Sequence, residues 1–467
     1  MKEIHIADLF CGAGGTSTGA IQAAHSLGRK VHLTAINHWE RAIETHSANH
    51  PDANHLCARI EDVTPESIFR RNELDLLWAS PECTHFSRAR GGAPIDDQRR
   101  VGAWRVVDWA ERLCPTFIMV ENVSEFLEWG PLKSDGSPCQ KRKGELFQQW
   151  AQTLRVLGYK VEWRLLRAAD YGDPTTRQRL FVQAVRGNKR IVWPDPTHQE
   201  ATKQPDLFRS VLPNWRPAAD IIDWDIPCPS IFTRTKPLAQ NTLRRIYSGL
   251  QKYGLEKYLI ELRGTDAAQL DTSARSTNAP LPTITAGGGH YGLVSPFLVH
   301  LAHGTKITRS VDRPLGTVVA GNPEWCLVQP HLLPQQSDGR LRPISEPAPT
   351  IATAGAIALV HPFLTQYYGT AETADIGNPL PTVTCNDRFG LVRPTVHRDG
   401  ETYELDIGYR MLQPHELAAA QGFPADYQFK GTKTEITRQI GNAVCPGIAR
   451  ALVTAALTQN SNVGQAA

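Results

Sequence analysis

The first 190 residues alternate short apolar runs with amphipathic stretches, and this pattern limits the fold more than any other feature of the chain. Short apolar runs favour buried strands, whereas the stretches between them have the spacing of helices. The apolar runs are IHIADLF (4–10), VHLTAIN (31–37), LDLLWAS (74–80), TFIMVEN (116–122) and RLFVQAV (179–185). Strands that alternate with helices predict an α/β fold with a mostly parallel sheet covered on both faces. In such sheets, ligands bind at the carboxyl ends of the strands.

Length and composition narrow the class of protein. A chain of 467 residues exceeds what one hydrophobic core comfortably supports, so we expect two domains. A net charge of +3 excludes a histone-like polycation. The nine cysteines are odd in number and form no CxxC pair, which argues against a disulfide framework and against a zinc site. Charged residues near the start, and the lack of a long apolar stretch, predict a cytoplasmic protein without a membrane partner.

From residue 191 the sequence becomes rich in proline and contains four repeats. They span residues 279–300, 313–333, 346–364 and 378–396, and their leading prolines lie 34, 33 and 32 residues apart. Each repeat opens with Pro-x-Pro/Gly-Thr, continues through β-branched residues and a turn, and reaches Leu-Val-x-Pro. We predict two short strands in each repeat, with proline at sheet edges or strand ends. A purely architectural array is the alternative to a functional surface.

Helix-like sequence resumes after residue 400, in RMLQPHELAAAQGFP and ITRQIGNAVCPGIARALVTAAL. We therefore predict a first domain at residues 1–190, a β-rich second domain at 191–400, and a return to the first domain at 401–458. The tail, residues 459–467, is predicted to be disordered.

The stretch WASPECTHFSRARGG (78–92) places Cys83 where a predicted strand ends. A free cysteine is most often a small buried hydrophobic residue, and that role is the alternative here. The residues around Cys83 are polar, however, and several arginines follow with only Asp96 and Asp97 among them. These arginines are Arg88, Arg90, Arg99, Arg100 and Arg105. A thiol that faces a cationic loop has the setting that stabilises a reactive thiolate, so Cys83 is a candidate nucleophile.

Three features at other predicted strand ends suit a nucleotide-like ligand. The glycine turn in DLFCGAGGTSTGA (8–20) lies between a strand and a helix, where the backbone can approach a ligand closely. Trp39 could stack on adenine, and Asp62 could accept a hydrogen bond from an exocyclic amine. The structural alternatives are a connecting turn, a core tryptophan and a turn-forming aspartate.

Glu121 and two arginines are candidates for the chemistry itself. Glu121 follows the apolar run FIMV at the end of a predicted central strand. Burial there would favour its protonated form, as a general acid near neutral pH requires. Arg177 and Arg179 lie on the same face of an extended segment and could hold a planar polar ligand. A surface position is the usual alternative for an arginine.

In their order along the chain, these features resemble the cytosine-C5 DNA methyltransferase family, of the bacterial or phage type. The resemblance is carried by six blocks: DLFCGAGG, SPECTHFS, ENV, RQR, RMLQPHELAAAQGFP and QIGNAV. It covers nearly the whole chain apart from residues 191–400, which occupy the position of the family's target-recognition domain. The resemblance implies a Rossmann-like methyltransferase domain with a mostly parallel, doubly wound sheet, and a β-rich target-recognition domain inserted into it.

The resemblance also implies the reaction, which is methylation of C5 of a cytosine in double-stranded DNA with S-adenosyl-L-methionine as cofactor. Cys83 would add to C6 of a cytosine flipped out of the duplex, and Glu121 would bind N3 of the ring. Arg179 would contact O2, with Arg177 supporting the site. The cofactor pocket would be lined by Phe10, Gly12, Gly14, Trp39, Asp62 and Asn442. We expect a monomer, and a cognate restriction endonuclease is a candidate partner.

The sequence departs from the family pattern at three places. Glu82 and Thr84 flank the cysteine, where the family commonly has proline and glutamine. His38 stands where an acidic residue commonly binds the ribose hydroxyls, and the neighbouring Glu40 is a candidate substitute. Thr175 replaces the glutamine that opens Gln-x-Arg-x-Arg. None of these departures removes a reacting group.

Three alternatives compete with a DNA methyltransferase. A tRNA cytosine-C5 methyltransferase of the same family is disfavoured by the large repeat-containing region. A catalytically idle DNA-binding relative is disfavoured because Cys83, Glu121 and the two arginines are all present. A dinucleotide-dependent oxidoreductase is disfavoured because the glycine turn lacks the GxGxxG spacing.

Overall fold

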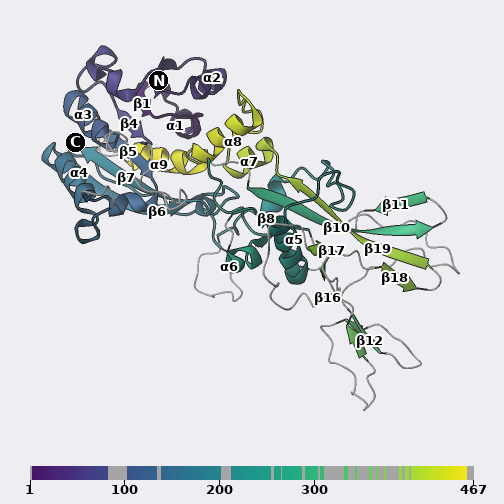
Figure 1. The fold of residues 1–467 in the computed structure, drawn as a ribbon. Coiled ribbons are helices and arrows are strands. Elements are labelled where there is room, and N and C mark those ends of the chain that lie inside the picture. The colour runs from purple at the N-terminus through teal and green to yellow at the C-terminus, as the bar shows by residue number, and fades with distance from the viewer. Residues whose placement is uncertain are drawn as a thin grey trace. The chain divides into compact units, whose positions relative to one another are not determined.

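The computed structural model describes residues 3–81, 102–133, 138–200, 212–253, 257–263, 266–286, 290–302 and 401–459, together with short strands between residues 305 and 398. The chain divides into two compact units (Figure 1). The first unit consists of Met1–Ile222, Asn278–Gly289 and Gln413–Ala467, and the second of Asp223–Thr277 and His290–Leu412. The chain therefore leaves the first unit twice and returns to it twice.

A seven-stranded sheet forms the centre of the first unit, in the order β3-β2-β1-β4-β5-β7-β6. Its parallel strands are β1 (Glu3–Leu9), β2 (Lys30–Asn37), β3 (Asn54–Cys57), β4 (Leu76–Ala79) and β5 (Phe117–Asn122). β7 (Gln178–Arg186) runs antiparallel to both β5 and β6 (Tyr159–Arg167). The predicted α/β fold with a mostly parallel sheet is confirmed. The strand order reverses between β1 and β4, which is where such sheets bind ligands.

Helices pack on both faces of this sheet because alternate residues of each strand point to opposite sides. α3 (Gly102–Leu113) and α4 (Glu145–Val156) contribute Trp109 and Trp150 to one core. α1 (Gly15–Ser26) and α9 (Pro446–Gln459) form the other core. The remaining helices are α2 (Glu40–Asn49), α7 (Pro414–Ala420) and α8 (Lys433–Asn442), with 3-10 turns at Ile60–Asp62, Pro65–Ser67, Ser124–Glu128, Gln140–Arg142, Ala168–Tyr171 and Ala218–Ile221.

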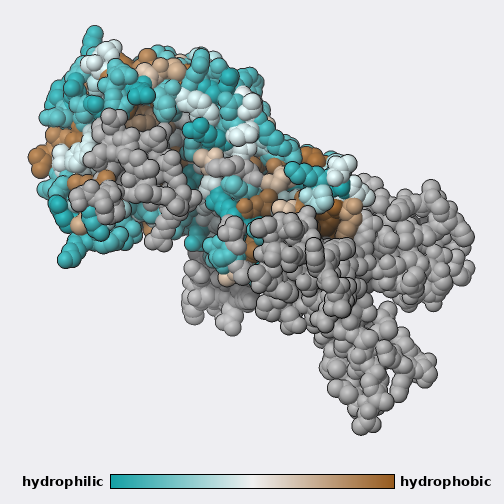
Figure 2. All heavy atoms as spheres, in the orientation of Figure 1, coloured by the Kyte–Doolittle hydropathy of each residue, from teal (hydrophilic) through white to brown (hydrophobic). Residues whose placement is uncertain are grey.

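Apolar side chains of the described residues are largely buried, and the face of the first unit seen in Figure 2 is mostly hydrophilic. The large hydrophobic side chains exposed in the described parts of the chain are Val156, Leu165 and Trp224. Within the same parts, the stretch Lys433–Thr458 is long and apolar enough to cross a membrane. Most of that stretch is buried inside the protein, as is usual for core helices of this composition.

The second unit is built on an antiparallel sheet in the order β18-β19-β10-β8-β9, with β11 paired to β10. Its strands are β8 (Tyr258–Glu261), β9 (Ala274–Ser276), β10 (Tyr291–Ala302), β11 (Thr305–Arg309), β18 (Thr395–Arg398) and β19 (Glu401–Met411). α5 (Gln240–Tyr253) and α6 (Ala267–Asp271) belong to the same unit. Two small sheets contain β12 (His331–Pro334), β13 (Arg342–Pro343), β14 (Ile357–Leu359), β15 (Leu364–Gln366), β16 (Thr373–Ala374) and β17 (Phe389–Leu391). The prediction of a separate β-rich region is confirmed.

The first repeat is split between the two units. Its second half lies in β10, as predicted. Its first half, residues 279–286, belongs to the first unit and forms no regular strand, so the prediction of a strand there is wrong. Pro280 and Pro282 explain this difference, because they remove two backbone donors that a strand would need. Most of the other three repeats lies outside the described residues.

The change of composition at residue 191 does not coincide with the boundary between the units, which follows Ile222. The proline-rich stretch after residue 191 begins on the first unit, where the Trp193 indole donates to Glu162 Oε2 at 2.9 Å. The Trp215 indole likewise donates to Asp170 Oδ1 at 3.0 Å. These contacts tie the stretch to β6 and to the turn that precedes β7.

The contact between α1 and α9 provides a test of the first unit's packing. An added Cβ at Gly19 would meet Pro446 O and lie 2.7 Å from both Ala449 Cβ and Arg450 N. We predict that Gly19→Ala lowers the free energy of unfolding by about 1–3 kcal/mol because the two helices cannot stay this close. Urea denaturation would measure the change. Gln22→Ala, on the exposed side of the same helix, is the control and should change stability by less than about 0.5 kcal/mol; equal effects would contradict the packing argument.

Candidate active site

The glycine turn between β1 and α1 lies at the point where the strand order reverses. Phe10, Gly12 and Gly14 have φ values of 61°, 53° and 94°, in the left-handed region. Glycine adopts this region without strain, whereas Phe10 is held there by its surroundings. Among the described residues, only Phe10 O lies near an added Cβ at Gly12, at 3.9 Å. The outer side of the turn at Gly12 is therefore open, and a ligand could approach the backbone closely there.

The other residues predicted to bind a cofactor come from the ends of neighbouring elements. Trp39 follows β2 and precedes α2, and Asp62 ends the 3-10 turn that follows β3. Asp62 and Asn442, at the end of α8, are both exposed. The guanidinium of Arg438 lies over the Trp39 ring at 4.8 Å from its centroid. β1, β2 and β3 are adjacent and parallel, so their carboxyl ends bring the turn, Trp39 and Asp62 to one edge of the sheet.

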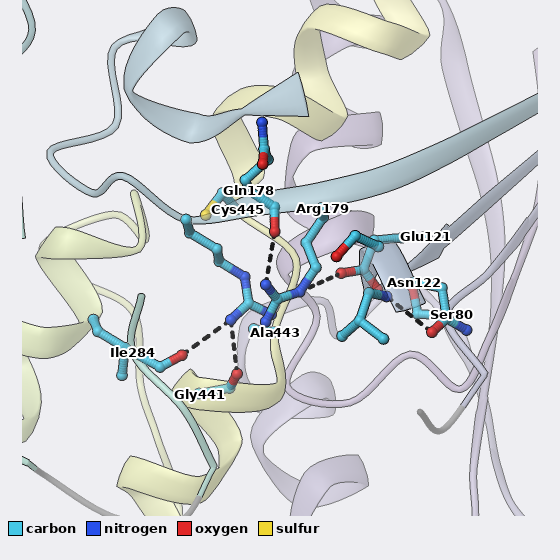
Figure 3. Close-up of polar contacts among 12 residues, drawn as sticks. Ser80, Glu121, Asn122, Gln178, Arg179, Ile284, Gly441, Ala443 and Cys445 are labelled. Carbon is cyan, nitrogen blue, oxygen red and sulfur yellow. Dashed lines mark hydrogen bonds and ion pairs between the residues drawn. The ribbon is translucent and has the colours of Figure 1, made fainter. Parts of the chain in front are cut away.

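Glu121 and Arg179 form an ion pair on two adjacent antiparallel strands (Figure 3). Glu121 Oε1 lies 3.3 Å from Arg179 Nε, and the Glu121 residue is only 7% exposed. Burial raises the pKa of Glu121, and the positive charges of Arg179 and Arg177 lower it in part. The net shift is upward, so more of this carboxyl group is protonated near neutral pH than of an ordinary glutamate.

Arg177 is buried and bonds to the backbone of two distant segments. Its Nη1 donates to Ile284 O at 3.0 Å and to Gly441 O at 3.1 Å (Figure 3). An added Cβ at Gly441 would meet the Thr285 carbonyl and lie 2.5 Å from Ala286 N. The guanidinium therefore fixes the end of α8 against residues 284–286. Its role toward a ligand stays a prediction.

Thr175, which departs from the family pattern, takes part in the same docking. Its hydroxyl donates to Pro282 O at 3.5 Å and accepts from Arg177 N at 3.3 Å. Backbone bonds on either side join Thr176 N to Leu281 O and Leu281 N to Pro174 O. Leu281 and Pro282 are thereby attached to the residues that precede β7.

Asn122 is a site residue that the sequence analysis did not single out. Its side-chain amide donates to Pro81 O at 3.3 Å, and its Oδ1 accepts from Val123 N at 2.9 Å. It therefore connects the end of β5 to the exit of β4, two residues before Cys83. The ENV block indicated such a role for Asn122, because a side-chain amide next to Glu121 can form hydrogen bonds to the backbone of a neighbouring strand. Cys83, Glu82 and Thr84 lie outside the described residues.

Comparisons with known proteins show which family this sequence matches. A family model described as C-5 cytosine-specific DNA methylase matches residues 4–225 and 372–457, which is more than half of the chain. The type II methyltransferase M.Sau3AI of Staphylococcus aureus is 29% identical over 191 residues, covering 39% of this chain and 43% of that protein. M.AgeI of Thalassovita gelatinovora, also a type II methyltransferase, is 31% identical over 235 residues, covering 48% and 50%. The matches thus span about half the length of these relatives.

Solved structures of methyltransferases are also similar over nearly the whole chain. The S. pombe Dnmt2 methyltransferase has 14% sequence identity and a TM-score of 0.48, and the match covers 98% of this chain and 99% of that chain.

The double contact of Arg177 generates a prediction about stability. Arg177→Ala should lower the free energy of unfolding by about 2–4 kcal/mol, because two backbone carbonyls lose a charged donor. Urea denaturation would measure the loss. Gln178→Ala, at the exposed neighbouring position that begins β7, is the control. An equal and small effect of both variants would show that the Arg177 bonds contribute little.

The ion pair generates a prediction about the protonation of Glu121. Removing the positive charge with Arg179→Gln should raise the pKa of Glu121 further, so its carboxyl stays protonated to higher pH. Infrared spectroscopy of the protonated carboxyl band, assigned by its loss in Glu121→Gln, would follow the titration. Arg179→Lys keeps the charge and should shift the midpoint less. An unchanged midpoint in Arg179→Gln would contradict the assigned pairing.

Proposed function

Because the chain belongs to the C-5 cytosine-specific DNA methylase family, we propose that it transfers a methyl group from S-adenosyl-L-methionine to C5 of a cytosine in double-stranded DNA. The observation that carries the proposal is the buried Glu121–Arg179 pair at the end of β5. Asn122 ties this strand end to the exit of β4, which leads to Cys83. The candidate proton donor lies at the end of β5, and the candidate nucleophile follows the neighbouring strand β4 in the sequence.

The chemistry needs an activated ring because C5 of cytosine is a weak nucleophile. In our proposal, the Cys83 thiolate forms a bond to C6, and the electrons of the C5–C6 double bond are displaced into the ring. Glu121 donates a proton or a hydrogen bond to N3, which disperses the developing charge, while Arg179 binds O2. Covalent addition in this way divides a difficult alkylation into easier steps. The base must first leave the stacked duplex, since its ring faces are otherwise inaccessible.

The reaction must then return every group to its starting state. After C5 has gained the methyl group, its proton passes to a base and the S–C6 electron pair returns to sulfur. This restores the C5–C6 double bond and frees the thiolate of Cys83. N3 gives its proton back to Glu121, whose raised pKa suits it to both directions of the transfer.

The residues around the glycine turn fit the proposed cofactor. The open backbone at Gly12 could face its amino-acid part, and Trp39 could stack on its adenine. Phe10, Gly14, Asp62 and Asn442 would complete the pocket. When bound, S-adenosyl-L-methionine supplies an electrophilic methyl group.

We assign target recognition to residues 191–400. The antiparallel sheet and the repeats of this region could present strands and turns to a DNA groove. The arginines that follow Cys83 could meet phosphates. A monomer in the cytoplasm, with a cognate restriction endonuclease as a candidate partner, completes the proposal.

DNA containing 5-fluorocytosine tests the covalent step. After methyl transfer, C5 carries fluorine in place of the proton, and elimination would have to remove fluorine as a cation. The adduct should therefore persist as a complex that resists denaturation, forms only with S-adenosyl-L-methionine, and maps to the peptide containing Cys83. Denaturing gel electrophoresis followed by peptide mass mapping would detect it.

Two variants make the trapping experiment specific. Cys83→Ser should give no adduct, because a serine hydroxyl is scarcely ionised at neutral pH, while Cys139→Ser should behave like the wild type. Fluorinated tRNA is a second substrate, and trapping on it alone would replace DNA by tRNA in the proposal. Absence of an adduct on both nucleic acids, with folded protein, would overturn the mechanism.

A further inference from the structure

The inner side of the glycine turn rests on a cluster of aromatic rings. An added Cβ at Gly14 would lie 2.6 Å from Tyr427 Oη, 3.0 Å from His46 Cδ2 and 3.3 Å from His50 Cδ2. The Tyr427 hydroxyl also donates to Ala13 O. The His46 ring centroid lies 4.8 Å from that of His50 and 4.9 Å from that of His55. The turn is therefore supported on the side opposite to its open backbone at Gly12.

One chain of hydrogen bonds runs from His55 to a buried carboxylate below the turn. Ser17 Oγ donates to Asp8 Oδ2 at 2.6 Å, which uses the only hydroxyl proton of Ser17. Ser17 Oγ must then accept from His46 Nε2, at 3.0 Å. His46 Nδ1 is left as the acceptor for His55 Nε2, at 2.8 Å. This pattern assigns a proton to His46 Nε2, and with Nδ1 as an acceptor the imidazole is neutral.

A second chain holds a carbonyl of the turn itself. Thr18 Oγ1 donates to Gly14 O at 2.8 Å, and so accepts from His50 Nε2 at 3.0 Å. His50 is thereby linked through one hydroxyl to the backbone at Gly14. The first chain passes through His46 of α2 and ends at Asp8 of β1, and the second starts at His50, the residue after α2, and ends at Gly14.

The charges around His46 favour its neutral form. The groups that act on it directly are the His50 and His55 imidazoles and the Ser17 hydroxyl. Burial lowers the pKa of His46, and the neighbouring imidazoles lower it further. Burial also lowers the pKa of His50, to about 4. Burial raises the pKa of Asp8 to about 7, and the hydrogen bond from Ser17 opposes this shift.

We propose that His46 and His50 are positioning residues for cofactor binding, which hold the glycine turn in its binding shape through Ser17 and Thr18. The inference rests on the proposed function, because it takes the turn to be part of the S-adenosyl-L-methionine site. Neither histidine contacts the Glu121–Arg179 pair, so losing them should weaken cofactor binding while the rate of the saturated enzyme is kept.

Variants of His46 separate ring size from hydrogen bonding. His46→Phe keeps the ring volume but removes the donor to Ser17 and the acceptor for His55. The dissociation constant of S-adenosyl-L-methionine, measured by isothermal titration calorimetry, should rise about tenfold. His46→Gln retains an amide donor and acceptor and should restore much of the affinity. His32→Phe is the control, since His32 stacks on His5 at the start of β1 and β2 and should leave the constant unchanged.

A double-mutant cycle distinguishes positioning from general destabilisation. Ser17→Ala removes the hydroxyl that links His46 to Asp8, and it is a smaller change. If His46→Phe does not fold, the affinity of Ser17→Ala for the cofactor tests the positioning role. Adding His46→Phe to Ser17→Ala should weaken binding little further, because both changes break one chain. With DNA as substrate, KM for the cofactor should rise while kcat stays within about twofold.

The outcomes separate this inference from the proposed function. A wild-type protein that binds no S-adenosyl-L-methionine would overturn both. A wild type that binds, together with His46→Phe and Ser17→Ala variants that bind equally well, would overturn the positioning role alone. Equal loss of affinity in His46→Gln and His46→Phe would also contradict the positioning role, because the hydrogen bonds of His46 would then contribute nothing to cofactor binding.

Discussion

The rest of the first unit's site depends on the buried guanidinium of Arg177. It joins β7 to Ile284 and Gly441, from segments that lie far from it and from each other in sequence. A buried guanidinium is costly unless its donors are bonded, so these two contacts offset part of the cost of burying Arg177. The same strand carries Arg179, whose position against Glu121 is set by the pairing of β5 with β7. Arg177 thus fixes the backbone, and Arg179 lowers in part the pKa of Glu121.

Desolvation makes the stability of the first unit depend on pH in two opposite directions. Burial raises the pKa of Asp8 and of Asp173 to about 7, which disfavours their charged forms. Stability from these carboxyl groups is therefore lost as the pH rises through about 7. His46 and His50 have lowered pKa values, so their contribution is complete above the ordinary value of 6.5 and is lost as the pH falls from there. The two sets of groups leave a window between about 4 and 7 in which neither penalty is complete.

Much of the fold could be predicted from the sequence, because short apolar runs identify buried strands and their ends identify the site edge. Glu121 and Arg179 were identified in this way, and the structure pairs their side chains, while their roles toward a ligand stay predictions. The support of the turn by His46 could not be predicted, since it depends on which helix face packs beneath Gly14. The first half of the first repeat was assigned wrongly because a β-branched run has the same composition in a strand and in a docked, irregular segment. The nucleophile Cys83 stays a prediction from its motif.

The contact of α1 with α9 has a consequence for how the protein is made. α1 ends at Ser26 and α9 begins at Pro446, yet Gly19 lies directly against Pro446 and Ala449. Tyr427 bonds to Ala13 across a similar separation. On the ribosome, the core between α1 and α9 therefore stays incomplete while the whole second unit is synthesised. Until α9 emerges, the nascent chain exposes the apolar face of α1, and that face is where a chaperone would be needed.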